Sequence, residues 1–213
     1  MDFIPSLGVL AAFTLAAAVL IVTPGPDMTL FLSRALTQGR AAGLAAMFGA
    51  LSGIVVHTML AAFGLSALLA ASPQGFFLVK AAGALYLLFL AYQALRHGSA
   101  LTLETSLRGR QSLWRSWAAG LGINLLNPKI VLFFVTFLPQ FVSASDPHAG
   151  GKLAFLGFYF IALAIPSCGA MILAASQFSA ALRRSPMISR GVDYACATIF
   201  GAFALRILTT RPG

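Results

Sequence analysis

The sequence predicts an all-α, polytopic membrane protein with about six transmembrane helices. Hydrophobic residues make up 59% of the 213 residues and charged residues only 9%, whereas about a quarter of an average soluble domain is charged. The apolar residues form long runs, and a helix needs about 20 of them to cross the hydrocarbon core. Lipid offers no partner to unpaired backbone groups, and the runs are too long for barrel strands, so we expect helices.

Apolar runs and helix breakers set the boundaries of the expected spans. The first run lacks the basic region of a cleaved signal peptide, so we expect it to remain as a helix. The connection over about 97–115 contains glycine, serine and threonine and is the expected linker between two halves, 1–96 and 116–213, of a single transporter domain. The six expected spans are 5–37, 41–70, 75–95, 116–142, 153–178 and 192–209.

The basic residues between the spans predict the orientation. Nine arginines fall in the first, third and fifth loops, against four lysines and arginines on the other side. The positive-inside rule therefore places these three loops in the cytoplasm and both termini in the periplasm of a bacterial inner membrane. The net charge of +9 is then explained by contact with membrane lipids, and no nucleic-acid partner is expected. The nine are Arg34, Arg40, Arg96, Arg108, Arg110, Arg115, Arg183, Arg184 and Arg190.

Two of the runs are interrupted at matching places. Thr23-Pro24-Gly25-Pro26 breaks the first run and Asn127-Pro128-Lys129 breaks the fourth, so both helices are expected to be broken or kinked. Laying residues 26–31 on 128–133 pairs proline, leucine and phenylalanine in one register. Each half has three spans, an odd number, so the halves must be inverted relative to each other. Inverted halves with broken helices indicate a transporter whose binding site lies at the breaks.

The prolines at the breaks predict half-helices that start inside the membrane. Proline suits the first helical position, so Pro26 and Pro128 are expected to start them, with Gly25 and Asn127 as N-caps. A half-helix start presents free N–H groups and a positive dipole end, which favour a carboxylate.

Asp27 and Lys129 follow the two prolines as ionisable residues inside the membrane. Such residues are costly and are functional candidates by default. Lys129 is expected to help bind a carboxylate, and Asp27 to bind an ammonium group or carry a coupling proton. In the alternative interpretation, the two charges only neutralise each other or reach the membrane surface.

The remaining candidates for the substrate site are Thr23 and Pro24, at the first break, and Asn124, one turn before Asn127. The position of Asn124 is equally compatible with a side chain that lines the cavity and with one that only forms a hydrogen bond between helices. Asp193 is a second candidate for proton coupling, or an acid that complements a helix dipole.

No catalytic, metal or cofactor site is expected. Cys168 and Cys196 lie in apolar runs without metal-ligand spacing, and His57, His97 and His148 are scattered over different segments. The paired cysteines of a membrane redox carrier are missing from both breaks. So are the Ser/His, paired-Glu and HExxH groups of an intramembrane hydrolase.

These motifs together resemble the lysine exporter and homoserine/threonine exporter (LysE/RhtB) family of amino-acid efflux proteins, over nearly the whole chain. The resemblance implies about six helices and export of amino acids or related small metabolites, driven by the proton-motive force. Ala91 departs from the family pattern, in which glycine is usual. Export of a small cation or another toxic solute is the alternative function. The segments that carry the resemblance are Thr23–Asp27, Lys80–Leu87 through Arg96, Asn127–Lys129, Phe137–Val142 and the glycines Gly39, Gly43, Gly49, Gly53 and Gly64.

Four of these glycines, Gly39, Gly43, Gly49 and Gly53, form small-residue patterns in the second expected span. Such patterns allow close helix packing, either within the bundle or across a homodimer.

Overall fold

The computed structural model describes residues 3–97, 111–143 and 146–177, with scattered residues between 187 and 205. The described part is helical and contains no strand, which confirms the all-α fold class. Its elements are α1 (Leu7–Val22), α2 (Pro26–Gln38), α3 (Arg40–Met59), the π-helix Leu60–Leu65, α4 (Ser66–Ala71), α5 (Pro73–His97), α6 (Leu113–Leu126), α7 (Pro128–Leu132), the π-helix Phe133–Phe137, the 3₁₀ turn Leu138–Phe141 and α8 (Ala149–Leu173).

The helices agree with the first five expected spans to within a few residues at each end. Two helices of the described part, Arg40–Leu65 and Ala149–Leu173, are long and apolar enough to cross a membrane. Two bent pairs, α1 with α2 and α6 with the segment Pro128–Phe141, also qualify if each pair is one span. The expected span 192–209 and the linker 97–115 lie largely outside the described residues.

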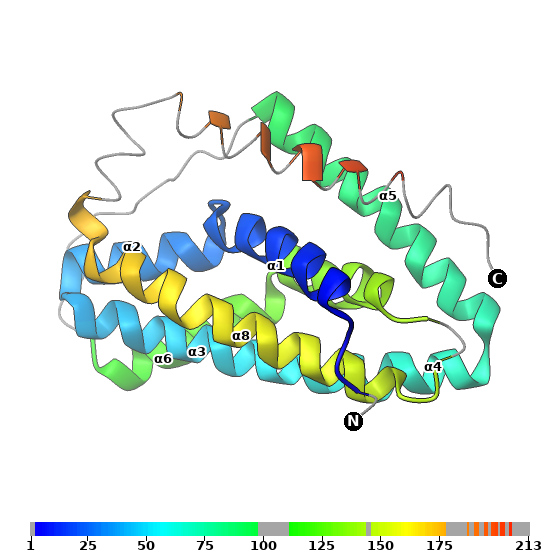
Figure 1. The fold of residues 1–213 in the computed structure, drawn as a ribbon. Coiled ribbons are helices and arrows are strands. Elements are labelled where there is room, and N and C mark those ends of the chain that lie inside the picture. Colours follow the sequence, from blue (N-terminus) through cyan, green and yellow to red (C-terminus); the bar gives the residue numbers. More distant parts are fainter. Residues whose placement is uncertain are drawn as a thin grey trace.

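Helix α3 packs against α2, α6 and α8 and runs along the lower side of the bundle in Figure 1. Its contact with α6 depends on residues without a side chain. A Cβ on Gly49 would run into the backbone carbonyl of Trp117, and a Cβ on Gly120 would run into that of Ala46. Small residues let membrane helices approach this closely. These glycines therefore pack within the bundle.

Gly43 and Gly39 allow the start of α3 to pack closely against the neighbouring helices. A Cβ on Gly43 would lie 2.9 Å from the carbonyl oxygen of Phe31 and 3.0 Å from a methyl group of Ile172. Gly39 joins α2 to α3 with a φ of 94°, a backbone conformation that glycine adopts without strain. The turn between these helices is therefore tight, and it holds α2 along α3.

Two π-helical segments, which the sequence analysis did not predict, continue the helices on either side of the core. Leu60–Leu65 extends α3, and Phe133–Phe137 follows α7. The second segment supplies three rings to an aromatic cluster that includes Phe13 of α1 and Phe160 of α8. Phe13 and Phe137 are fully buried. π-helical turns are rare and are often found near functional sites.

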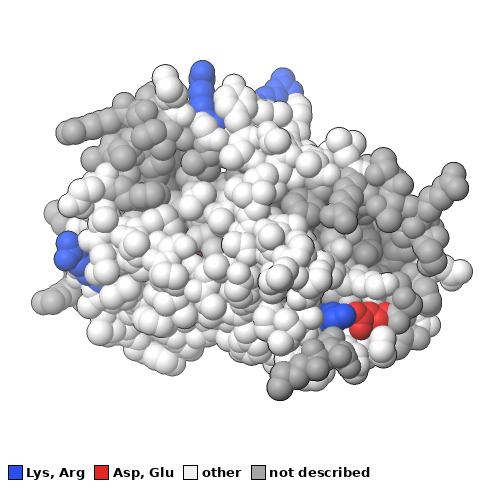
Figure 2. All heavy atoms as spheres, viewed as in Figure 1, with Lys and Arg blue, Asp and Glu red and all other residues white. Residues whose placement is uncertain are grey.

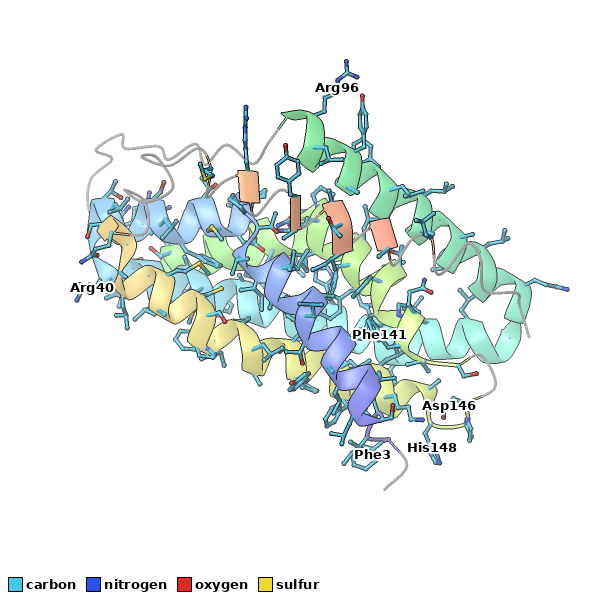
Figure 3. All side chains as sticks on the ribbon, turned by 45° about the horizontal axis from the view of Figure 1, so that its top comes forward. Phe3, Arg40, Arg96, Phe141, Asp146 and His148 are labelled. Carbon is cyan, nitrogen blue, oxygen red and sulfur yellow. The ribbon has the colours of Figure 1, made fainter. Side chains whose placement is uncertain are left out.

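The surface has the distribution expected of a membrane protein. On the face shown in Figure 2, most of the coloured charged side chains lie toward the margins, and the wide middle is mainly uncharged. Large apolar side chains such as Leu60 and Phe63 are exposed. Figure 3 shows Arg40 at one end of the bundle and Phe3, Asp146 and His148 at the other.

A small charged cluster lies in the loop before α8. Lys152 forms an ion pair with Asp146, and the backbone N–H of His148 donates to Asp146 Oδ1 at 2.9 Å. The hydrogen bond from Lys152, followed by that from His148, lowers the pKa of the Asp146 carboxyl below its usual value. The cluster stabilises the start of α8.

The contact between α3 and α6 gives a direct test of the packing. We expect Gly120→Ala to lower the free energy of unfolding by about 1–3 kcal/mol, because the added methyl group overpacks the site against Ala46. The measurement is the melting temperature of the detergent-solubilised protein. Gly122→Ala, on the same helix, is the matched control because a Cβ there meets nothing within 4 Å. Equal melting temperatures for the two variants would contradict the packing.

Candidate functional site

The two breaks have the same geometry, as the sequence predicts. Helix α1 ends at Val22 and α2 begins at Pro26, with a bend of 52°, and α6 and the helical segment from Pro128 also meet at 52° (Figure 1). Pro26 and Pro128 each occupy the first turn of the new helix, with Gly25 and Asn127 as the N-caps. The expected half-helix starts are confirmed.

The two half-helix starts differ in how their backbone donors are used. Asn127 Oδ1 accepts a hydrogen bond from the N–H of Lys129 at 3.1 Å, so this start is capped by its own sequence. Gly25 has no side chain and provides no such bond to α2. Because helix geometry leaves the first N–H groups without an intrahelical acceptor, those of Asp27 and Met28 remain available to a ligand.

Asp27 contacts Asn124 of the other half of the chain. Asn124 Nδ2 donates to Asp27 Oδ2 at 2.9 Å. The other oxygens of the two side chains, Asp27 Oδ1 and Asn124 Oδ1, are buried and have no hydrogen-bond partner among the described residues. Buried polar atoms without partners are rare in native proteins, so two orphan acceptors on one hydrogen-bonded pair of side chains indicate a place where a donor from outside the chain binds.

Gly53 of α3 makes room for this pair. A Cβ at Gly53 would lie 2.5 Å from Asn124 Oδ1. The close approach of α3 to α6 therefore reaches as far as the site, and it fixes the amide that faces Asp27.

Lys129 reaches across to the end of α1. Its Nζ donates to the carbonyl oxygens of Leu20 at 2.9 Å and Thr23 at 2.8 Å. These carbonyls belong to the open C-terminal end of a half-helix, where a positive charge also complements the helix dipole. Lys129 thus joins the second break to the first, and the contacts of its ammonium differ from those of the Asp27 carboxylate.

These groups face one cavity of about 60 Å³ at the breaks. Six of the sequence-predicted site residues line it, namely Thr23, Gly25, Asp27, Asn124, Asn127 and Lys129. Pro24, Pro26 and Pro128 are not among its lining residues, and they shape the breaks instead. Asp193 lies outside the described residues. Most of the remaining wall is apolar and comes from α1, α2, α3 and α8.

Two residues near the site were not singled out from the sequence. His57 of α3 is buried, and its Nε2 lies 3.4 Å from the carbonyl oxygen of Asn124. Its position as an ionisable residue inside a span was the signal that could have identified it. Cys168 of α8 lines the cavity. No spacing pattern in the sequence could have indicated this position. In the described part of the chain, no group of His, Cys, Asp or Glu could hold a metal ion.

Comparison with known proteins matches residues 18–211 to the LysE type translocator family. An uncharacterized membrane protein of Pseudomonas aeruginosa is 27% identical over 96% of this chain and 98% of its own length. The homoserine/homoserine lactone efflux protein of Salmonella typhimurium is 31% identical, over 64% of this chain and 66% of its own length. An uncharacterized membrane protein of Vibrio cholerae is 34% identical over the same shares. No solved structure matches the chain.

Single cysteines should show that the breaks open into a cavity that water can reach. With both native cysteines replaced, we expect Gly25→Cys and Asn127→Cys to react with small water-soluble thiol reagents, because both positions line the cavity. Ala16→Cys is the control, since Ala16 is fully buried on α1 and away from the cavity wall. Labelling is measured by mass spectrometry in intact membranes. Complete protection at positions 25 and 127 would mean that the breaks are packed kinks.

Proposed function

We propose, from the premise that this chain belongs to the LysE type translocator family, that it exports amino acids or related small zwitterionic metabolites by proton antiport. The efflux protein of Salmonella typhimurium supports an amino-acid-type substrate. The observation that carries the proposal is the pair of buried acceptors, Asp27 Oδ1 and Asn124 Oδ1, beside the uncapped start of α2.

The substrate ammonium binds between Asp27 and Asn124. An ammonium group has three donors and no acceptor, which complements two oxygens that lack a donor. A hydrogen bond to an ionised carboxylate is stronger than one between neutral groups, and the effect is greater away from water. Asn124 Nδ2 holds the carboxylate in place through Oδ2. The ammonium therefore completes a cluster that is already oriented.

The substrate carboxylate binds at the start of α2, next to Lys129. The free N–H groups of Asp27 and Met28 and the positive end of the helix dipole favour an anion there. Lys129 adds a full positive charge, and a Cβ on Gly25 would lie only 3.6 Å from its Nζ. The uncapped helix start and the ammonium of Lys129 therefore lie next to each other.

Proton antiport follows if the proton and the substrate compete for one group. Protonation of Asp27 would remove the charge that holds the substrate ammonium, and deprotonation would restore it. Asp27 is therefore the proposed coupling residue, with Asp193 as the second candidate. A cation exporter, the alternative function, would use Asp27 in the same way but would have no use for the positive charge of Lys129.

The orientation is part of the proposal. Nine loop arginines on one side favour periplasmic termini in the inner membrane. We expect a C-terminal alkaline phosphatase fusion to be active and a green fluorescent protein fusion at the same position to be dark, as measured in whole cells. The reverse pattern would overturn the orientation while leaving the transport mechanism untouched.

Charge neutralisation at the site tests the binding mechanism. We expect Asp27→Asn and Lys129→Gln each to abolish efflux of radiolabelled substrate, and the double variant to be no better, because each charge binds a different end of the zwitterion. If the charges only neutralised each other, each single variant would lose about 3–5 kcal/mol of stability and the double variant would recover. Efflux and membrane abundance are measured together, and the swapped variant Asp27→Lys with Lys129→Asp is included.

Asp146→Asn with Lys152→Gln is the matched control for these variants. It removes an ion pair that lies in the loop before α8, away from the cavity, and should leave efflux unchanged. Full efflux by the double neutral variant at positions 27 and 129 would end the substrate-binding hypothesis.

A further inference from the structure

We propose that the apolar wall of the cavity is a subsite for an uncharged aliphatic or thioether side chain, so that the substrates are amino acids such as leucine, isoleucine and methionine. This inference rests on the proposed function, because the polar groups of the cavity must already hold the ammonium and carboxylate of the substrate.

The ionisable groups on the cavity wall are few. Among the described lining residues they are Asp27, Lys129 and Cys168. The first two are assigned to the common part of every amino acid. A charged substrate side chain would therefore meet no further opposite charge among the described lining residues, which is strongly unfavourable away from water.

The rest of the wall is apolar, and most of its side chains come from α2, α3 and α8, with further ones from α1 and α7. They surround the polar cluster from α2, α3 and α8, and several are buried in the bundle. Phe160 also packs against Phe133 and Phe134, which ties this wall to the aromatic cluster. The residues with the greatest influence are expected to be Met28, Phe31, Met47, Ile54, Phe160 and Met171.

Three of the wall residues are methionines, one on each helix: Met28, Met47 and Met171. Methionine is unbranched and polarisable, and it adapts to ligands of different shape. A wall of this kind selects for apolar character more strongly than for one particular branched shape. Leucine, isoleucine and methionine should therefore all bind, with modest differences among them.

Among the described lining residues, Thr23 carries the one hydroxyl group. The hydroxyl of Thr23 already donates to the carbonyl of Val19 at 2.6 Å. A hydroxyl group on the substrate side chain would therefore add little binding free energy here. An apolar pocket discriminates against a substrate with an added hydroxyl by a factor of at most about a hundred.

The test is counterflow in proteoliposomes that contain the purified full-length protein. Vesicles loaded with leucine should take up radiolabelled leucine, and unlabelled isoleucine and methionine should compete at least about tenfold better than lysine, glutamate or homoserine. Preference for lysine or glutamate would overturn this inference and leave amino-acid export standing. Failure of every amino acid to exchange would overturn both the inference and the proposed function.

Changes in the size of the cavity give a second readout that does not depend on the amount of folded protein. Ala164→Val narrows the wall on α8 and should lower the ratio of leucine to alanine exchange about tenfold. Met171→Ala widens it and should move the preference toward phenylalanine. Ala162→Val, on the same helix but exposed and away from the cavity, is the matched control and should keep the original ratio. Unchanged ratios in both cavity variants would contradict the assignment of this wall to the substrate side chain.

Discussion

The contact of Lys129 with the end of α1 is the interaction on which the site depends. Breaking a helix inside the membrane leaves carbonyl and N–H groups without their helical partners, and each one that stays unsatisfied costs several kcal/mol. Lys129 Nζ donates hydrogen bonds to the carbonyl oxygens of Leu20 and Thr23, and Asn127 caps its own half-helix. The start of α2 is left without such a cap. The backbone donors there are consequently available for a ligand.

Close packing of α3 on α6 makes this arrangement rigid. Gly49 and Gly120 remove the side chains that would hold the two helices apart, and Gly53 does the same beside Asn124. Since van der Waals packing rather than the hydrophobic effect holds helices together in lipid, these contacts contribute much of the association of the two halves. They also bring Asn124 to Asp27, residues separated by 97 positions in the chain. The same glycines thus serve both stability and the geometry of the site.

The two halves are alike in their bends and different in their chemistry. Both bends are 52°, yet one break carries an acid and the other a base. A site between them is suited to a molecule with both charges, and the apolar wall from α2, α3 and α8 suits an uncharged remainder. In the proposed mechanism, the charged groups and the side chain of the substrate bind to different surfaces of this one cavity.

The sequence by itself determined the helical class, the helices at the first five expected spans, both breaks and most of the polar lining, because hydropathy and proline act locally along the chain. The partners of those residues were decided by tertiary structure. Lys129 binds carbonyl oxygens at the end of α1, Asn124 binds Asp27, and His57 contacts the carbonyl oxygen of Asn124. The π-helical segments and the apolar wall also depend on packing. Contacts between helices bring together positions far apart in the chain, and no local pattern records which faces will meet.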